Sequence, residues 1–350
     1  MKGRKAGFTL IEMLISIAIV AFVLAAASAF FIMSVKQFKV QTKIIESNIE
    51  GMIGLELFRR DLDNLGLGLP WNNLSAYTER TATGMAALND SSGSAPRAVV
   101  SIDCAASTLT VNGSDYLVIK SASVGMKDAA GKWTTLVRSG SKRTWDPPEE
   151  NLASNDYVIV LALGTTDANR RSLVNPGTPY TQFSNTGGFV PLEPYSANII
   201  YGIDNVTPFR PFNRAEYFVS SDNVPQRCAV NTGILVKAVV AHDTDGTIPT
   251  LLPLLDCVAD MQVVFGLDNN ADGAVNTWST DISVGMTAAQ IRTQLVEVRV
   301  YILAQEGLRD TSYTHPINPI YVGSASIGGG RNFNITGYSN YRWKLYNIVV

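Results

Sequence analysis

The stretch Gly7-Phe8-Thr9-Leu10-Ile11-Glu12 decides how the rest of the chain is organised. Three basic residues lie within the five positions at the start of the chain, and an apolar run follows the stretch as far as Met33. The span 8–33 exceeds the ~20 apolar residues that a helix needs to cross a membrane. Because basic residues favour the cytoplasmic side, the body of the chain is expected on the opposite side of the membrane.

Glu12 is an unusual residue for such a span, because an acidic side chain there costs roughly 2.5–3.5 kcal/mol on insertion scales. Its own helix offers no cation, since the nearest basic residues precede Gly7. A cut after Gly7 would leave a positive α-amine on Phe8, and the Glu12 of a neighbouring copy could neutralise it. The alternative is an uncleaved signal anchor with a chance acidic residue. A conventional signal peptide fits less well, because its apolar core is only ~7–15 residues long and precedes the cut.

The segment from Lys5 to Glu12 resembles the processing site of a type IV prepilin. The resemblance implies that a prepilin peptidase cuts after Gly7 and that a methylating enzyme modifies the new N-terminal Phe8. It also implies that Glu12 neutralises the amine of an adjacent subunit during assembly. On this basis the chain is expected to consist of a leader (1–7), a long helix (8–66) and a β-rich domain (71–350).

The composition is that of a chain with a sizeable core: 350 residues, of which 46% are hydrophobic and 17% are charged. The formal net charge is −2, and it falls to −5 without residues 1–7, which carry three basic side chains and no acidic one. Nucleic-acid binding calls for a basic patch or stripe, and the sequence shows none. No nucleic acid is therefore expected among the partners.

A helical pattern continues beyond Met33 but becomes amphipathic. We therefore expect one helix over Phe8–Leu65, with 8–33 in the membrane or a filament core and 34–66 amphipathic. Gly66, Gly68 and Pro70 would end it. The second half of the helix is expected to dock a globular domain. Its apolar stripe, which must be covered by other apolar groups, consists of Val35, Phe38, Ile45, Ile49, Met52, Leu55, Leu62 and Leu65.

Segments rich in Val, Ile, Tyr and Leu, bounded by turn residues, predict strands over much of the remaining chain. They are Ala98–Asp103, Thr108–Val111, Asp115–Val124, Trp133–Val137, Asp156–Leu163, Ile199–Ile203, Glu216–Val219, Gly233–Val240, Met261–Leu267, Leu295–Leu303 and Tyr341–Val350. The predicted class is α+β: a long N-terminal helix packed on a large, mainly antiparallel β-rich domain. This layout resembles the PilW-like minor pilins and the related J-type pseudopilins of type II secretion. The resemblance is strongest over 1–66 and recurs at 258–272 and 295–303.

An acidic loop is the candidate metal site of the body. Its residues follow the opening of a calcium-binding loop, in which oxygen ligands alternate along the chain and a glycine makes the turn. The candidate ligands are Asp268, Asn270, Asp272, the backbone carbonyl of Ala274, and Asn276. The bidentate Glu of such loops is missing, since Ser279 stands at that position. A hairpin turn whose side chains bond their own backbone is the alternative.

Cys228 and Cys257 flank the predicted strand Gly233–Val240 and its return connection, so a disulfide between them is possible in an oxidising compartment. Cys104 would then remain as a small buried apolar residue.

No catalytic constellation emerges, because the two histidines are isolated and the common nucleophile and P-loop motifs are absent. We therefore expect no enzyme and no cofactor other than the possible calcium. The expected function is that of a minor type IV pilin that helps to initiate or assemble a pilus at or near its tip. A J-type pseudopilin is the alternative, and a pilin-anchored adhesin or surface enzyme is more distant. The expected location is the inner membrane, with a periplasmic domain, and then the pilus. The expected partners are other minor and major pilins and the inner-membrane assembly platform.

Overall fold

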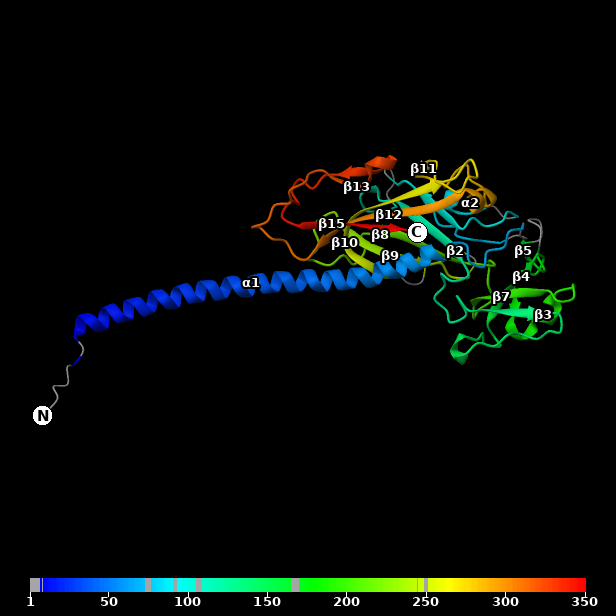
Figure 1. Cartoon of the computed structure of the whole chain (residues 1–350), viewed down its shortest axis with the longest axis horizontal. Helices are drawn as coiled ribbons and strands as arrows, with labels where there is room; N and C mark the ends of the chain where they lie inside the picture. Colours follow the sequence, from blue (N-terminus) through cyan, green and yellow to red (C-terminus); the bar gives the residue numbers. More distant parts are fainter. Residues whose placement is uncertain are drawn as a thin grey trace.

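The structure is a computed structural model that describes residues 7, 9–72, 77–90, 93–104, 109–164, 170–243, 245–248 and 251–350. The side chains of residues 40, 46–48 and 50 also lie outside this description. A long helix, α1 (Leu10–Asp63), projects from one side of a β-rich body, and only its second half lies against that body (Figure 1). The predicted α+β class is confirmed.

The bounds of α1 follow from its caps. Thr9 is the N-cap, and Asn64 ends the helix with its backbone N–H bonded to the carbonyls of Arg60 and Leu62. The helix was predicted over Phe8–Leu65, so its last turn ends slightly earlier than expected, where Gly66 and Gly68 adopt positive φ. Phe8 lies outside the described residues.

The main sheet has the strand order β1-β2-β8-β9-β10-β12-β15, with β11 paired to β10. Its pairings are antiparallel throughout. The strands are β1 (Val99–Ile102), β2 (Tyr116–Ser121), β8 (Asn213–Ser220), β9 (Gly233–Val239), β10 (Leu251–Leu267), β11 (Thr277–Ser279), β12 (Leu295–Glu306) and β15 (Arg342–Val349).

A second antiparallel sheet is inserted between two neighbouring strands of the main sheet. It has the order β3-β7-β4-β5, with β6 paired to β4. Its strands are β3 (Trp133–Val137), β4 (Tyr157–Leu163), β5 (Arg170–Leu173), β6 (Thr181–Gln182) and β7 (Ala197–Asp204). All of them fall between β2 and β8, whose ends pair at Ser121 and Asn213. We call residues 122–212 the insert; it lies at the end of the body farthest from the N-terminus (Figure 1).

The remaining elements are short. They are the hairpin β13 (Ile320–Ser324) and β14 (Gly329–Phe333), the helix α2 (Ala288–Gln294), and five 3₁₀ turns among the described residues: Ala86–Leu88, Val111–Gly113, Pro148–Glu150, Phe183–Phe189 and Ala325–Ile327. The strand predicted at Thr108–Val111 is wrong in its described part, because the chain there forms a 3₁₀ turn in which Asn112 has φ 54°. The sequence pattern also missed β5, β6, β11, β13 and β14.

The main core lies between the second half of α1 and one face of the main sheet. Leu55, Phe58 and Leu62 of the helix pack there with buried Leu, Val, Ile and Phe side chains of β2, β8, β9, β10 and β12. The insert has apolar clusters of its own, built on β4 and β7. The helix is therefore attached to the body by the main sheet.

Candidate functional site

The N-terminus of α1 carries a capping box formed by Thr9 and Glu12. The Glu12 carboxylate accepts hydrogen bonds from the Thr9 backbone N–H (2.9 Å) and hydroxyl (2.8 Å), while the Glu12 N–H donates to Thr9 Oγ1 (3.3 Å). Glu12 thus has hydrogen-bond partners on Thr9, three residues before it, although these groups carry no positive charge. Gly7 is exposed, and no atom lies within 4 Å of where a Cβ would sit.

The first half of α1 is exposed along its length and apolar enough to cross a membrane over Leu10–Ile45. Its large side chains, from Leu10 to Ile32, are exposed on every side of the helix. This surface requires lipid or other apolar helices around it, because no described element of the body lies beside it (Figure 1).

Two glycines let the second half of α1 lie close to β10. A Cβ on Gly54 would sit 1.8 Å from the carbonyl oxygen of Leu254, and a Cβ on Gly51 would sit 2.8 Å from a methyl carbon of Leu255. No larger residue fits at Gly54 unless the helix moves away from the strand. The pair therefore sets the distance between helix and sheet.

A ring stack and a polar cluster fix the position of the helix end. Phe58 stacks on Tyr217 of β8 with 4.4 Å between ring centroids. The Tyr217 hydroxyl donates to the carboxylate of Asp61, which also pairs with Lys237 of β9 at 2.6 Å. Burial, and then the nearby Asp61 carboxylate, raise the pKa of Tyr217 well above its usual value. Asp61 was not predicted as a site residue, although a charge between the buried Phe58 and Leu62 on one helix face was a signal for it.

The outward face of the docked half is apolar as well. Five side chains there are each at least 50% exposed: Ile45, Ile49, Met52, Ile53 and Leu57. The predicted stripe therefore divides into two faces: the body covers Leu55 and Leu62, whereas Ile45, Ile49 and Met52 point away from it. The body thus covers only part of the stripe, because the glycines turn the face containing Leu55 toward β10.

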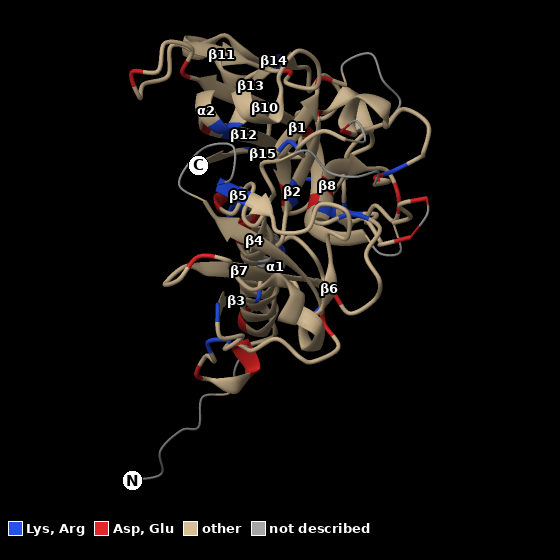
Figure 2. Cartoon of the chain, turned by 90° about the vertical axis from the view of Figure 1, so that its right-hand side faces the viewer, with Lys and Arg blue, Asp and Glu red and all other residues tan. Residues whose placement is uncertain are grey.

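Buried charges hold the segment 77–97 on the strands β2 and β8. Glu79 accepts from Lys120 (2.7 Å) and Arg214 (2.5 Å), and Asp90 accepts from Lys120 (2.5 Å) and Arg97 (2.6 Å). Burial opposes ionisation of Asp90, but Lys120 and Arg97 outweigh it and lower the pKa of this carboxyl. In Figure 2 the ribbon of β2 and β8 carries blue and red positions close to each other. Removing one partner of such a pair leaves a buried charge without its counter-ion, which is costly. The cluster therefore fixes the position of the segment 77–97.

The acidic loop is held by its own backbone. The Asp268 carboxylate accepts N–H groups from Asn270 (3.1 Å), Ala271 (2.7 Å), Asp272 (3.3 Å) and Gly273 (2.7 Å). These bonds, that of Gly273 foremost, lower the pKa of Asp268. The other candidate ligands also lie together: Asn276 Nδ2 donates to Asn270 Oδ1 (2.8 Å), and Ala274 N donates to Asp272 Oδ1 (2.8 Å). No cluster of three or more acidic, His or Cys side chains suited to a metal occurs among the described residues.

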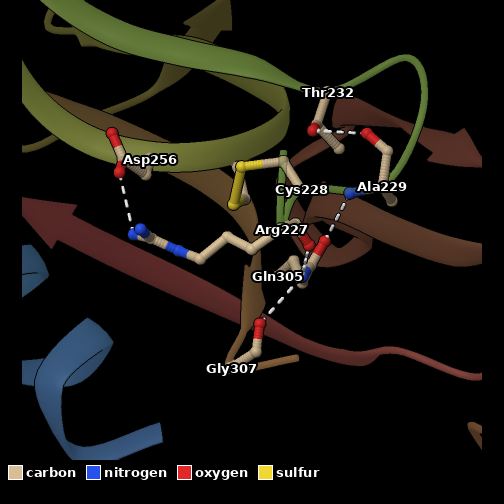
Figure 3. Close-up of a disulfide and its surroundings, with 8 residues drawn as sticks. Arg227, Cys228, Ala229, Thr232, Asp256, Gln305 and Gly307 are labelled. Carbon is tan, nitrogen blue, oxygen red and sulfur yellow. Dashed lines mark hydrogen bonds and ion pairs between the residues drawn. A yellow bond between two sulfur atoms is a disulfide. The ribbon is translucent and has the colours of Figure 1, made fainter. Parts of the chain in front are cut away.

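Cys228 and Cys257 are joined by a disulfide, with 5.0 Å between their Cα atoms, whereas Cys104 is buried elsewhere. The bond ties the loop before β9 to β10 (Figure 3). Next to it, Gln305 of β12 accepts from the Ala229 N–H (2.7 Å) and donates to the carbonyls of Arg227 (2.9 Å) and Gly307 (2.8 Å). Arg227 also pairs with Asp256 at 2.8 Å. One loop is thus attached to two strands of the main sheet.

A long helix is apolar in its first half, has a glutamate in its N-terminal capping box and docks by its second half on an antiparallel body. This combination defines a pilin-like subunit. Comparison with known families agrees: the prokaryotic N-terminal methylation motif matches residues 2–28, and the Type IV Pilus-assembly protein W family matches residues 216–350. These matches at the two ends of the chain support a type IV pilin-like minor pilin, similar to the PilW family. No curated protein and no solved structure matches it. The second match begins within β8, so the insert lies outside it.

These family matches carry coarse functional statements. Pilin-type families are structural rather than enzymatic, and they interact with other pilins and with the assembly machinery. The apolar helix and the methylation motif indicate membrane anchoring and association with a pilus.

Proposed function

We propose that this minor pilin takes part in initiating or assembling a type IV pilus at or near the filament tip. In this proposal a prepilin peptidase cuts after Gly7, a methylating enzyme modifies Phe8, and the body lies in the periplasm before assembly. Glu12 then serves as the contact to the amine of a neighbouring subunit.

The observation that carries the proposal is the outward apolar face formed by Ile45, Ile49, Met52, Ile53 and Leu57. A membrane-spanning helix alone would need no such face beyond its span, since residues 45–57 lie alongside the body. At about 25 cal/mol per Å², covering large apolar side chains contributes of the order of 2 kcal/mol each. Helices of other subunits, packed against this side of α1, would supply that cover.

The proportions of the body support a place near the tip. The body comprises ~280 residues, a size that is difficult to repeat at the close subunit spacing of a shaft. The insert enlarges the end of the body opposite the membrane span (Figure 1). A subunit present in few copies at the end of a filament has room for such a projection.

The test is a charge on the outward face. Ile49→Asp should leave the body folded, because Ile49 is half exposed and belongs to the outward face, but should exclude the subunit from a helix bundle. Pili per cell, counted by electron microscopy in a strain complemented with the variant, should fall at least ten-fold at unchanged protein level. Val284→Asp, the same kind of change at an exposed valine away from α1, is the matched control.

The outcome also separates the alternatives. Normal piliation with lost secretion of exoproteins would assign the chain to a secretion pseudopilus instead. Normal piliation and secretion in Ile49→Asp would contradict an assembly role for this face. Processing is tested independently by mass spectrometry, which should find a methylated Phe8 at the N-terminus of the mature chain, and an intact Met1 in piliated cells would contradict it.

A further inference from the structure

A groove separates α1 from the part of the body nearest to the membrane span. Its volume is about 690 Å³, and it is lined by Met33, Lys36, Gln37, Gln41 and Ile44 of the helix and by Asp310, Ser312 and Arg342 of the body. The segment between β12 and β13 reaches along the helix toward its first half (orange in Figure 1). At the start of this segment Gly307 approaches Ile44, since a Cβ there would lie 2.7 Å from an Ile44 side-chain carbon.

The polar groups in the groove leave a net positive charge. The Asp310 carboxylate already accepts three hydrogen bonds: from the Ser312 N–H (3.0 Å), the Ser312 hydroxyl (2.5 Å) and Arg342 Nη1 (3.0 Å). Arg342 therefore neutralises Asp310 and keeps further N–H donors that bond no described residue. Lys36 has no hydrogen bond or ion pair within the described part of the chain. The groove thus presents one uncompensated cation and several hydrogen-bond donors.

The groove lies at the level of lipid headgroups. A hydrocarbon core of ~30 Å takes up ~20 helical residues, so a span that starts at Leu10 leaves the core near Phe30. Lys36 follows six residues later, about 9 Å farther along the axis. The headgroup layer extends for roughly 5–8 Å on each side of the core, and a long lysine side chain reaches back into it.

We propose that this groove binds the phosphate of an anionic phospholipid headgroup while the subunit resides in the membrane. Lys36 would supply the uncompensated charge, and Arg342 and the amides of Gln37 and Gln41 would supply additional hydrogen-bond donors. An apolar helix of another subunit fits less well, since six of the eight lining residues are polar. The inference rests on the membrane span and not on the proposed place at the tip.

The experiment uses the full chain in nanodiscs made of equal parts phosphatidylglycerol and phosphatidylcholine. Lipid that stays bound after transfer to detergent is identified by native mass spectrometry. Phosphatidylglycerol should be retained several-fold over phosphatidylcholine. Lys36→Gln should reduce this retention about five-fold, the usual effect of one lysine near an anionic surface. Lys39→Gln, a change at another exposed lysine of the same helix that does not line the groove, should leave it unchanged.

Three results would overturn the assignment. Equal losses in Lys36→Gln and Lys39→Gln would mean diffuse attraction to the membrane surface rather than a site. Equal retention of the two lipids would leave the groove to the helix of a neighbouring subunit. Displacement of the lipid by millimolar inorganic phosphate would mean that a free anion, not a lipid, is the ligand. Because Lys36 is exposed, its substitution leaves the fold intact.

Discussion

Asp61 of α1 and Lys237 of β9 form an ion pair across the boundary between helix and sheet, with 2.6 Å between Asp61 Oδ2 and Lys237 Nζ. Tyr217 of β8 donates its hydroxyl to the same carboxylate oxygen. One side chain of the helix therefore bonds two neighbouring strands of the main sheet, near the C-terminal end of the helix.

Removing this carboxylate should loosen the helix from the sheet. Asp61→Ala leaves the Tyr217 hydroxyl and the Lys237 ammonium without their partner, which should lower the free energy of unfolding by about 2–4 kcal/mol. Asp63→Ala, two residues farther along the helix and exposed, should change it by less than about 0.5 kcal/mol. Urea unfolding of the full chain in detergent measures both values. Equal effects of the two substitutions would contradict the role of Asp61 as a clamp between helix and sheet.

Gly54→Ala tests the close approach of helix and strand. Alanine favours an isolated helix over glycine by about 1 kcal/mol, so a helix that stood alone would be stabilised. Here the added Cβ meets the Leu254 carbonyl, and we expect a net loss of about 2–3 kcal/mol instead. Faster proteolysis after residue 50 should accompany it. Ile53→Ala at the neighbouring exposed position is the control, and a stabilised Gly54→Ala variant would show that α1 does not rest on β10.

Glu12 separates membrane insertion from assembly. Glu12→Val removes an insertion cost of a few kcal/mol, so protein level in the membrane should hold or rise. Pilus number should fall, because the amine of a neighbouring subunit would be buried without its partner at a cost of about 3–5 kcal/mol. Glu12→Gln keeps an acceptor for Thr9 but not the charge, and we expect it to be nearly as impaired. Unchanged piliation in both variants, with processing demonstrated, would rule out Glu12 as the assembly contact.

His242 should make stability fall in mild acid. Its ring bonds Asn213 Oδ1 (3.1 Å) and accepts the Phe209 N–H (3.3 Å), and burial, with Arg210 nearby, lowers its pKa to about 2. The unfolded chain takes up this proton near pH 6.5 and the folded chain does not. Stability therefore falls as the pH drops below 6.5, by up to about 1.4 kcal/mol per pH unit.

The His242 contribution is measured as the difference between the unchanged chain and His242→Gln in urea unfolding at pH 7, 6 and 5. The difference is needed because Asp115 acts in the opposite direction: burial raises its pKa to about 8, so its contribution falls as the pH rises from about 4 to 8. His315→Gln, at the other histidine, which is only partly buried, should keep the full slope of the unchanged chain. A slope that survives in His242→Gln would assign the acid sensitivity to other groups.

Calcium binding by the acidic loop remains a prediction. Ligand that binds only the folded state stabilises it by RT ln(1 + [L]/Kd), so calcium in excess should raise the melting temperature of the full chain above its value in EDTA. Asp272→Asn should abolish that rise, whereas Asp243→Asn, in a similar turn bonded to Thr247, should keep it. Identical melting curves in calcium and EDTA would mean that the loop is a turn held by Asp268 alone.

The sequence was most informative where one pattern determines one element. The apolar run predicted the helix, and segments rich in Val, Ile, Tyr and Leu predicted most strands of the main sheet. The same signal predicted β3 of the second sheet, Trp133–Val137, with its observed bounds. Short strands such as β5 (Arg170–Leu173) and β6 (Thr181–Gln182) were not predicted, because their residues are mainly polar. Both strands pair with β4 of the insert. Their conformation follows from their neighbours rather than from their own residues.

The candidate site shows the same limit. Regular apolar spacing cannot tell which of two faces of a helix meets the body, and here Gly51 and Gly54 decide it through a distance to β10 that no local pattern contains. The contacts of Asp61 depend likewise on strands more than 150 residues away along the chain. Only the fold brings these residues together.

The insert leaves β2 at Ser121 and rejoins β8 at Asn213, and these two residues are opposite each other in the same ladder. The chain thus leaves and re-enters the main sheet at one paired position. A tight turn could join Ser121 to Asn213 directly without altering the register of β2 and β8. An insert connected in this way can be lengthened, shortened or exchanged while α1, its glycines and the contacts of Asp61 stay the same. The end of the body far from the membrane span can therefore vary independently of the helix by which the subunit would join a filament.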